Sequence, residues 1–335
     1  MKNDINNFKI HKNDFLFLGE NLHRPECVIT TQENAIWVSD ARGGVTRIGK
    51  HGNQQHFGFN LNVLNKTPLD GKDLPNGLCF TLNRKLLIAN LGKNCLEEMN
   101  LFNGERIVLV DSIDGKPLGK VNYVLEDSKG KIYLTVSTNK DKWIDSINTY
   151  TDDGYIAVIE NGIIRIIMDN LKFPNEIRFD KNEEFLYLAE TCGQVIKRFK
   201  LNKNGNIINT EIFGPSNLGD AGFPDGIAFD TQGNLWGTLA AAEKIFCITP
   251  EGDIFTVFDD GCEIYRKLIQ AAFEAGTIDE SILLGHLSTI APLMTSIAFG
   301  GDELDTIYVG SVLGKSIPYI KTPFNGLKPL WWNYI

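Results

Sequence analysis

One pattern of polar and apolar positions recurs six times along the chain. Each copy has a polar opening, a short apolar segment, a turn of Asp, Asn, Gly or Lys type, and a second apolar segment rich in Ile, Leu, Tyr or Trp. This order predicts a pair of adjacent β-strands. The six copies are Pro25 to Asp40, Pro75 to Asn90, Val121 to Val136, Pro174 to Glu190, Pro224 to Leu239 and Thr295 to Ser311.

The spacing of the copies indicates the architecture. They start at residues 25, 75, 121, 174, 224 and 295, so consecutive starts are 50, 46, 53, 50 and 71 residues apart. This is the period of a propeller blade and not of a βαβ unit. Two further strands follow the fourth copy, at Val195 to Leu201 and Ile207 to Phe213, and two follow the fifth, at Lys244 to Ile248 and Ile254 to Phe258. The sequence therefore predicts an all-β, six-bladed β-propeller that forms one domain over residues 1–335.

Two segments depart from the regular repeat. The excess residues of the last spacing, Cys262 to Ile290, change from a strand-like to a helical pattern. They predict a helical insertion before the last blade, which would lie over one face of the propeller. A passive surface insertion and a lid over an active site both remain open. Near the N-terminus, Asp14 to Leu18 has the pattern of a strand, and we expect it to complete the last blade and close the ring.

A polar residue occupies the second position of every copy. Because the first strand of each blade lines the central channel, we expect these six side chains to converge on the axis. The alternative is that Asn and Asp only cap the strand entry by bonding their own backbone, as in many turns. All six fall at one repeat position, which favours a polar axial site. The six residues are Glu26, Asn76, Asn122, Asn175, Asp225 and Ser296.

The residue types on the axis indicate a cation site. The carboxylates of Glu26 and Asp225, together with amide oxygens, form a hard oxygen site that suits Ca²⁺ first. Mg²⁺, Mn²⁺ or Zn²⁺ are alternatives, although the ring offers none of the Cys or His that zinc usually selects. One such ion could polarise an ester carbonyl, while Asp225 or Glu26 orients or deprotonates the attacking water. A carboxylate bound to a dication has a lowered pKa, so it would act as a base only through an oxygen that stays free.

Two basic side chains are placed to contact a small-molecule substrate. Lys120 stands two residues before Asn122, and Arg42 lies in the turn Ala41-Arg42-Gly43-Gly44, so both could reach the mouth of the channel. There they could bind a carboxylate or a ring oxygen. The alternative for each is an ordinary solvated surface charge.

Composition and charge exclude several other classes of protein. The net charge is −9, the pI is near 5.2, and no Lys/Arg cluster stands out, so we expect no nucleic-acid partner. The first 20 residues are polar and no stretch is long enough to span a membrane, so we expect a cytoplasmic protein with no membrane partner. Nothing in the composition indicates an oligomeric state.

Cysteine and histidine patterns add little chemistry. The six cysteines form no Cys-x-x-Cys pair, which argues against a zinc knuckle or a redox motif. Cys27 is the one to follow, because it stands next to Glu26. The five histidines have no Gly-x-Ser-x-Gly or His-Glu-x-x-His motif beside them, so a serine hydrolase or a zinc peptidase has no visible apparatus.

The blade openings carry a family resemblance. Pro-Asn-Gly-Leu-Cys-Phe, Pro-Asn-Glu-Ile-Arg-Phe-Asp and Pro-Asp-Gly-Ile-Ala-Phe-Asp start at residues 75, 174 and 224. With these motifs the chain, from about Pro25 to Pro323, resembles the senescence marker protein, gluconolactonase and luciferin-regenerating enzyme family. The resemblance implies a six-bladed propeller with a single divalent metal ion held by a Glu, an Asn and an Asp, and lactone hydrolysis as the best known activity.

The resemblance also implies roles for particular residues. The metal ligands fall on Glu26, Asn175 and Asp225, and Asp225 also matches the proposed general base. The substrate-binding Arg and Asn of the third blade fall on Lys120 and Asn122, so the Arg is replaced. We also expect Asn76, from the axial ring, to contact the substrate.

Departures from the family pattern concern the wall of the pocket. The first blade opens with Pro25-Glu26-Cys27-Val28 where Glu-Gly-Pro or Glu-Ser-Pro is usual, and Tyr123 stands where Asp is usual. Glu176 replaces a Gly and adds a carboxylate near the site, which would either bind a cationic group of the substrate or face solvent. The substrate is therefore expected to differ from an ordinary sugar lactone.

These observations predict a metal-dependent hydrolase of a small lactone or ester. Three alternatives remain open: a phosphotriesterase or arylesterase with similar oxygen ligands, a propeller resembling strictosidine synthase that catalyses a condensation, and a non-enzymatic propeller that binds a ligand or a partner. The complete set of Glu26, Asn175 and Asp225 argues against the second.

Overall fold

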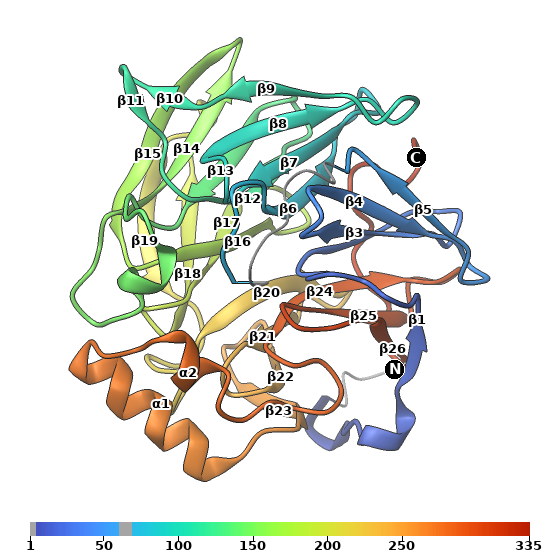
Figure 1. Ribbon diagram of the computed structural model, residues 1–335, viewed down its shortest axis with the longest axis vertical. Coiled ribbons are helices and arrows are strands. Elements are labelled where there is room, and N and C mark those ends of the chain that lie inside the picture. The colour runs from blue at the N-terminus through green and yellow to red at the C-terminus, as the bar shows by residue number, and fades with distance from the viewer. Residues whose placement is uncertain (1–4, 60–68) are drawn as a thin grey trace.

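Six four-stranded antiparallel sheets are arranged around a central axis in the computed structural model, which describes residues 5–59 and 69–335. Figure 1 looks along this axis, with the chain passing from blade to blade around the ring. The predicted six-bladed β-propeller is confirmed. Each of the six repeated segments forms the first two strands of a blade.

Within each blade the strands follow one another in sequence from the axis outward, and only the last blade is assembled from both ends of the chain. Blades 1 and 2 contain β2 (Val28–Thr30), β3 (Ile36–Asp40), β4 (Gly44–Ile48), β5 (Gln54–Phe57), β6 (Pro75–Phe80), β7 (Leu86–Asn90), β8 (Cys95–Met99) and β9 (Arg106–Val110). Blades 3 and 4 contain β12 (Val121–Glu126), β13 (Ile132–Val136), β14 (Gly154–Glu160), β15 (Ile163–Leu171), β16 (Pro174–Phe179), β17 (Phe185–Glu190), β18 (Val195–Leu201) and β19 (Ile207–Ile212). Blades 5 and 6 contain β20 (Pro224–Phe229), β21 (Leu235–Leu239), β22 (Lys244–Ile248), β23 (Ile254–Asp259), β24 (Met294–Gly300), β25 (Thr306–Ser311), β26 (Ile317–Lys321) and β1 (Leu16–Leu18). Outside the blades lie the small hairpin of β10 (Ser112–Ile113) and β11 (Lys116–Pro117) and the 3₁₀ turns Ile5–Asn7, Lys12–Asp14 and Trp143–Ser146.

The N-terminal strand closes the ring. β1 pairs antiparallel with β26, with Leu16 opposite Tyr319 and Leu18 opposite Ile317. The predicted closure by residues 14–18 is confirmed. Because the outermost strand of blade 6 comes from the other end of the chain, the first and last parts of the sequence are held together by main-chain hydrogen bonds, and the closed ring leaves few unprotected strand edges.

The hydrophobic core lies between neighbouring blades rather than on the axis. The largest apolar cluster joins blades 1 to 4 through buried side chains, among them Ile29, Leu78, Val124 and Leu188. Burying a side chain of this size contributes about 1.5–3 kcal/mol. Since the sheet faces supply this apolar contact, polar side chains can occupy the start of each inner strand at the axis.

A bulge interrupts the inner strand of five blades at the same place. In blade 2, Pro75 pairs with Asn90 and the next pair is Leu78 with Ile88, so Asn76 and Gly77 together oppose one residue. Such a bulge bends the strand and changes the direction of a side chain. Equivalent register shifts occur at the second position of the other blades, between Val121 and Tyr123, Pro174 and Ile177, Pro224 and Ile227, and Met294 and Ile297.

The glycines of the Pro-Asn-Gly and Pro-Asp-Gly openings are required by close packing at the axis. A Cβ on Gly77 would lie 2.8 Å from the carbonyl oxygen of Asn122, and a Cβ on Gly226 would lie 2.5 Å from Cα of Ser296. Both contacts are shorter than packed atoms allow. The third position of each opening therefore lies where one inner strand touches the next.

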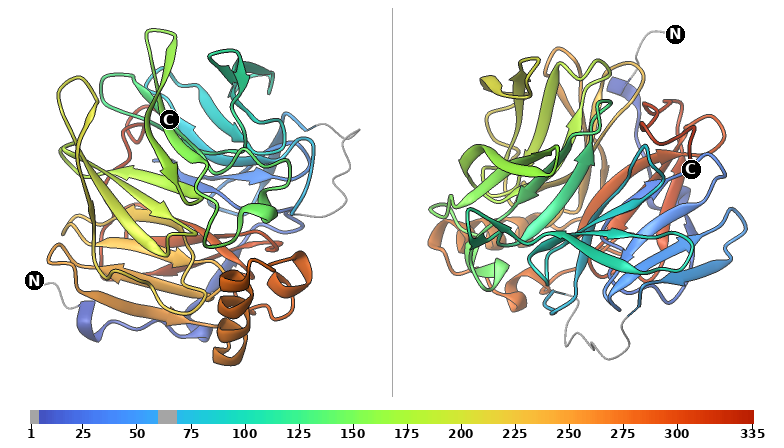
Figure 2. Two further views of the ribbon diagram at one scale, coloured as in Figure 1. Left: turned by 90° about the vertical axis from the view of Figure 1, so that its left-hand side faces the viewer. Right: turned by 90° about the horizontal axis from the view of Figure 1, so that it is seen from above.

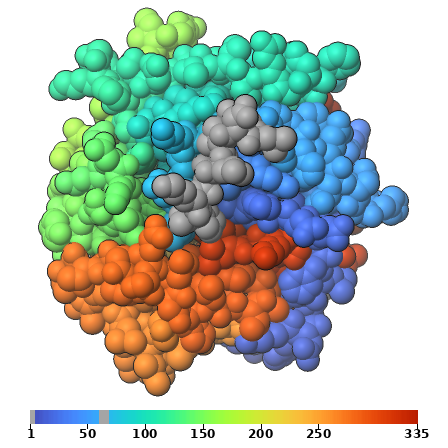
Figure 3. Space-filling view, viewed as in Figure 1, coloured from blue at the N-terminus to red at the C-terminus, as the bar shows by residue number. Residues whose placement is uncertain are grey.

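The predicted helical insertion is confirmed and lies on the face where the inner strands begin. α1 (Glu263–Ala275) and α2 (Glu280–Leu283) stand on one side of the blades in Figures 1 and 2, and they form part of the face shown in Figure 3. Phe273 of α1 packs edge-to-face on Phe223, with ring centroids 4.9 Å apart. Phe223 stands two residues before Asp225, so the insertion is anchored beside the entrance of the axial channel. Its role as a lid stays a prediction.

Candidate active site

The six residues at the second repeat position are all buried. Their exposed fractions run from 1% for Asn76 and Ser296 to 8% for Asp225. Hydrogen bonds or electrostatic interactions link Glu26 with Asn76 and Asp225, Asn76 with Asn122, and Asn175 with Asp225. The structure therefore brings the predicted ligands Glu26, Asn175 and Asp225 together at the start of the channel.

A chain of hydrogen bonds starts at Arg24, a residue that the sequence pattern did not single out. Arg24 Nη2 donates to Oδ1 of Asn76 at 2.7 Å, and Nη1 donates to the carbonyl oxygen of Pro75 at 3.2 Å. Nδ2 of Asn76 then donates to Oε1 of Glu26 at 3.0 Å and to the carbonyl oxygen of Asn122 at 3.0 Å. Because Arg24 occupies Oδ1, the orientation of the Asn76 amide is fixed, and this oxygen is not free to bind a cation.

Two buried oxygens remain free for a ligand. Oδ1 of Asn175 and Oδ1 of Asp225 accept no hydrogen bond from the residues that the structure describes. The amide nitrogen of Asn175 donates to Oγ1 of Thr191 at 3.3 Å, and the Asn175 side chain also interacts with the carboxylate of Asp225. A buried acceptor without a partner costs about 1–3 kcal/mol. Both oxygens therefore fit the coordination of a cation, which would remove this cost.

The carboxylates of the site repel one another in a buried environment. Burial raises the pKa of Glu26 to about 7, against the opposing effects of Arg24 and Asn76. Burial also raises the pKa of Asp225 well above its ordinary range; Glu26 and Glu176 raise it further, while Arg24 and Asn175 lower it. A divalent cation between Glu26 and Asp225 would stabilise both ionised carboxylates.

Glu176 faces a cation of its own chain. Its Oε2 accepts from Nη2 of Arg178 at 2.8 Å and from the backbone N–H of Ile227 at 3.2 Å. Its exposed fraction is 3%, so the alternative of a solvent-facing carboxylate is wrong. Burial raises its pKa, and Arg178 is the strongest opposing influence. The guanidinium of Arg178 also lies over the ring of Tyr123, 4.6 Å from the centroid. A contact between Glu176 and a substrate stays a prediction.

The donor set of the site is mixed. Over the ranges 5–59 and 69–335, no three His, Cys, Asp or Glu side chains are grouped closely enough to hold a metal ion. This agrees with the pairing of Glu176 and Arg178, which leaves two carboxylates on the axis. A cation here would be held by Glu26, Asp225 and the amide oxygen of Asn175, and carboxylates with amide oxygens are the ligands that Ca²⁺ and Mg²⁺ prefer.

The two predicted rim cations have different surroundings. Lys120 is half-buried, and burial lowers its pKa while Asp70 and Asp141 raise it. Arg42 donates from Nη2 to Asp40 Oδ2 at 2.6 Å and lies 4.7 Å from the centroid of the Phe59 ring. The charge of Arg42 is thus balanced by a neighbour two residues away. A substrate contact of either residue stays a prediction.

A cavity of about 430 Å³ lies on the same face as the ring of ligands, between the Trp143–Ser146 turn and α2. Its wall includes Asp70, which interacts with Lys120. Nε1 of Trp143 donates to the carbonyl oxygen of Leu69 at 2.6 Å and fixes one side of the cavity. The helical insertion therefore contributes a wall beside the entrance, through Ile278 to Ser281.

Cys27 has a structural role. It is fully buried, and its sulfur accepts from the backbone N–H of Leu78 at 3.3 Å. Burial raises the pKa of this thiol well above its usual range, with Glu176 and Glu26 adding to the effect. The thiol is therefore protonated at neutral pH and unsuited to nucleophilic chemistry.

Comparison with known proteins identifies the family of the chain. Residues 24–265 match the family described as SMP-30/Gluconolactonase/LRE-like region. The match covers more than half of the chain and includes all but the last of the axial residues. The chain belongs to this family.

Three individual proteins illustrate the relationship. An adipocyte plasma membrane-associated protein from Danio rerio is 31% identical over 256 residues, which make up 70% of this chain and 57% of that protein. A gluconolactonase from Zymomonas mobilis is 26% identical over 192 residues, or 53% of this chain and 52% of that protein. The chain thus spans little more than half the length of these curated relatives. The third is a solved structure of regucalcin from Agrobacterium tumefaciens, which is described as a calcium-binding protein. It superposes on this chain with a TM-score of 0.67 and 13% identity, over 93% of this chain and 97% of that one. The two proteins therefore share the fold.

In the described part of the chain, no helix is both long and apolar enough to cross a bilayer. The expected cytoplasmic location stays a prediction.

Proposed function

We propose that the protein is a metal-dependent hydrolase of a small lactone or ester, with its reaction at the axial site. The observation that carries the proposal is the pair of buried, unpaired oxygens, Oδ1 of Asn175 and Oδ1 of Asp225, beside the carboxylate of Glu26. Family membership supports it, as does the relationship to a gluconolactonase.

The residues present fit one divalent cation. Glu26, Asn175 and Asp225 would hold it, and Ca²⁺ is the first choice because every donor is oxygen. When bound, such an ion supplies Lewis-acid polarisation of the substrate carbonyl. The likeness in fold to a calcium-binding regucalcin supports this choice of ion.

The protein's own groups would orient the substrate and the water. Asp225 is the first candidate for the base that accepts a proton from water, through the oxygen that is not directed to the cation, and Glu26 is the second. Oδ1 of Asn122 accepts from Asn76, which leaves the amide nitrogen of Asn122 to donate to a substrate oxygen. Lys120 stands at the entry of the same strand, where it would bind an anionic or hydroxyl group.

Arg24 adds a fixed positive charge to the site. Its electrostatic interactions reach both Glu26 and Asp225, and its hydrogen bond holds Asn76 in place. We infer that this guanidinium helps to stabilise negative charge that develops on the substrate oxygen as the water attacks.

The decisive test combines metal binding with catalysis. After exhaustive dialysis, the metal content of the protein is measured, and Ca²⁺ is titrated by calorimetry into the native chain, Asp225→Ala and the control Asp253→Ala, which changes an exposed carboxylate in an outer turn. We expect one ion per chain for the native protein and the control, and none for Asp225→Ala. Hydrolysis of a panel of sugar and aliphatic lactones should follow the same order. Absence of cation binding by the native chain would overturn the hydrolase mechanism, and cation binding without hydrolysis of any lactone or ester would favour a binding propeller.

A further inference from the structure

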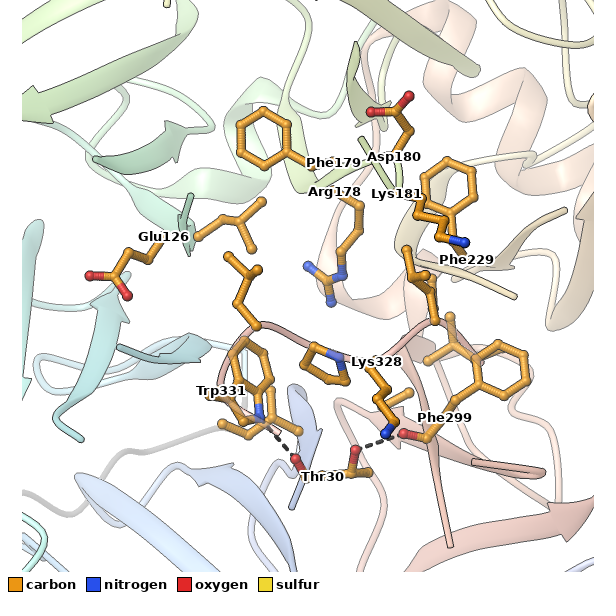
Figure 4. A pocket seen from close by; sticks show the side chains of 18 of the residues that line it. Thr30, Glu126, Arg178, Phe179, Asp180, Lys181, Phe229, Phe299, Lys328 and Trp331 are labelled. Carbon is orange, nitrogen blue, oxygen red and sulfur yellow. Dashed lines mark hydrogen bonds between the residues drawn. The ribbon is translucent and has the colours of Figure 1, made fainter. Parts of the chain in front are cut away.

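A second cavity lies at the opposite end of the central channel from the axial site. The predicted metal ligands stand at the starts of the inner strands, whereas this cavity is bordered by their ends, where Thr30, Glu126, Phe179 and Phe229 are the last residues of β2, β12, β16 and β20. Figure 4 shows these side chains around an open centre. The cavity is thus separate from the proposed active site.

The C-terminal segment is tied across this end of the channel and forms one wall. The backbone N–H of Leu327 donates to the carbonyl oxygen of Phe229 at 2.8 Å, and Nε1 of Trp331 donates to the carbonyl oxygen of Thr30 at 2.9 Å. The Trp331 ring also packs edge-to-face on Phe80, with centroids 6.1 Å apart. These bonds connect blades 5 and 1, so the wall is held in place from both sides.

The wall of the cavity is largely apolar. Leu125, Phe179, Phe229, Phe299 and Trp331 line it. Its volume is about 180 Å³, and a cavity of about 150 Å³ lined by apolar side chains holds one benzene ring. The space therefore fits one small ring or a short branched chain with a polar group attached.

The carboxylates on the wall are already engaged. Glu126 accepts from the backbone N–H of Leu82 at 2.6 Å, Asp180 accepts from the backbone N–H of Glu184 at 2.8 Å, and Glu183 accepts from Ser128. Figure 4 shows the carboxylates of Glu126 and Asp180 directed away from the centre.

The cations on the wall differ in their partners, because Arg178 is paired with Glu176 and the two lysines are not. Lys181 and Lys328 line the rim, and neither forms an ion pair with a residue that the structure describes. The guanidinium of Arg178 points into the cavity in Figure 4. It donates to Glu176 from Nη2 and to the carbonyl oxygen of Ile177 from Nη1. A guanidinium has five N–H groups, so further donors remain for an anion at the base of the cavity.

We propose that this cavity is a binding site for a small apolar carboxylate, with the ring or chain against Phe179, Phe229 and Trp331 and the carboxylate bonded to Arg178. The apolar wall selects the body of the ligand. The fixed fork of the guanidinium and the two rim lysines select its negative charge. Ligand pockets generally combine such a wall with a few convergent polar groups.

Benzoate is the probe for the test, and benzyl alcohol is its uncharged counterpart of similar shape. Each is titrated by calorimetry, with EDTA present, and binding is followed in parallel by tryptophan fluorescence, because Trp331 borders the cavity. We expect saturable binding of benzoate with a Kd on the order of 0.1–1 mM. Benzyl alcohol should bind roughly ten- to a hundredfold more weakly, since hydrogen bonds to charged groups are the strong ones.

Two kinds of variant locate the site. Ala298→Phe fills the cavity from β24 and should abolish benzoate binding. The double variant Glu176→Gln with Arg178→Met removes the anchor without leaving a buried carboxylate unpaired, and it should weaken binding about tenfold or more. Glu176→Gln alone is its matched control and should keep benzoate binding, because Arg178 then loses a competing partner.

The rim lysines are tested by charge removal. Lys328→Gln should weaken benzoate binding by a few-fold, as expected for a partly exposed charge, while Lys203→Gln in an outer turn of blade 4 should leave it unchanged. Thermal melts of every variant verify folding. The proposal is overturned if benzoate does not saturate at 10 mM, if benzyl alcohol binds equally well, or if binding survives in both folded Ala298→Phe and the double variant.

Discussion

Arg24 and Asn76 are joined by a buried hydrogen bond of 2.7 Å, from Nη2 of the arginine to Oδ1 of the amide. This bond turns the other end of the amide, Nδ2, toward Glu26. Arg24 itself adopts a left-handed backbone conformation, with φ of 54°, which is costly for a residue with a side chain. The positive charge of Arg24 is thus buried at the edge of the site, beside the carboxylates of Glu26 and Asp225 that would bind a metal ion.

The substitution Arg24→Met should therefore strengthen the response to Ca²⁺. Without this charge, less positive charge offsets the negative charges of Glu26 and Asp225. The variant without a bound metal ion should therefore melt at a lower temperature, and it should bind Ca²⁺ about tenfold more tightly than the native protein. Melting curves with and without Ca²⁺ measure the effect. Arg47→Met, which removes an arginine from an outer part of the same blade, is the control. An equal or smaller Ca²⁺-induced rise in Tm than in the native protein would show that Arg24 acts mainly by positioning Asn76.

The substitution Asp225→Asn should stabilise the protein in EDTA at pH 8 while abolishing its response to Ca²⁺. Burial and the neighbouring carboxylates raise the pKa of Asp225, so its ionised form is costly without a cation. The Asn side chain has a similar shape without the charge. The substitution should therefore raise the free energy of unfolding in EDTA by about 1–3 kcal/mol. Denaturant unfolding in EDTA measures it, with Asp253→Asn as the control. A loss of stability in EDTA would mean that the carboxylate contributes to folding without metal.

The axial site could be predicted from the sequence because its residues share one position in the six repeated segments. A polar residue at one position of six copies predicted that Glu26, Asn175 and Asp225 meet, because the symmetry of a propeller places equal repeat positions around one axis. The strand-like pattern of residues 14–18 predicted the closing strand, β1. Pattern alone did not reveal the bulges, since the register shift at Asn76 depends on pairing with β7, which is known only once the strands are placed.

Arg24 and Arg178 were missed for different physical reasons. Arg24 occupies the same repeat position as Lys120, directly before the first residue of its copy, and comparison of these two openings could have identified it. Arg178 belongs to the inner strand β16, and its partner Glu176 lies two residues earlier on the same strand. Two opposite charges two residues apart in a buried strand are a signal for an internal ion pair, which balances the extra carboxylate of this blade.

Closure of the ring by β1 should contribute strongly to stability. Leu16 lies in β1 opposite Tyr319, and its side chain is exposed. Because Pro318, opposite Phe17, has no N–H, the hydrogen-bonded pairs of this ladder are the ones on either side, which include Leu16 with Tyr319. The substitution Leu16→Pro removes one of these hydrogen bonds and fixes φ. Ile107→Pro makes the same change opposite Glu98 in β9, the outermost strand of blade 2, which does not close the ring. We expect Leu16→Pro to lower the free energy of unfolding by about 1–3 kcal/mol, and by more than Ile107→Pro; equal losses would contradict a special role of the closing strand.

The stability of the protein should also depend on pH through Glu243, which lies outside the axial site. Its Oε1 accepts from the backbone N–H of Ser288 at 3.3 Å and of Leu293 at 2.9 Å, which ties the end of the helical insertion to the start of blade 6. Its Oε2 is buried without a hydrogen-bond partner among the described residues. Burial raises the pKa of this carboxyl from 4.5 to about 7.

A raised carboxyl pKa means that the folded protein binds the proton more tightly than the unfolded chain does. Between pH 4.5 and 7 the folded state keeps this proton while the unfolded state has lost it, so the contribution of Glu243 to stability falls as the pH rises. Above pH 7 the loss is complete and amounts to about 3 kcal/mol, at about 1.4 kcal/mol for each pKa unit. Glu243→Gln resembles the protonated carboxyl, so it should raise Tm at pH 8.5 by several degrees and change it little at pH 4.5. Melting curves of the native protein, this variant and the exposed control Glu251→Gln across this range test the prediction, and a gain of the same size at both pH values would show that ionisation of Glu243 is not its cause.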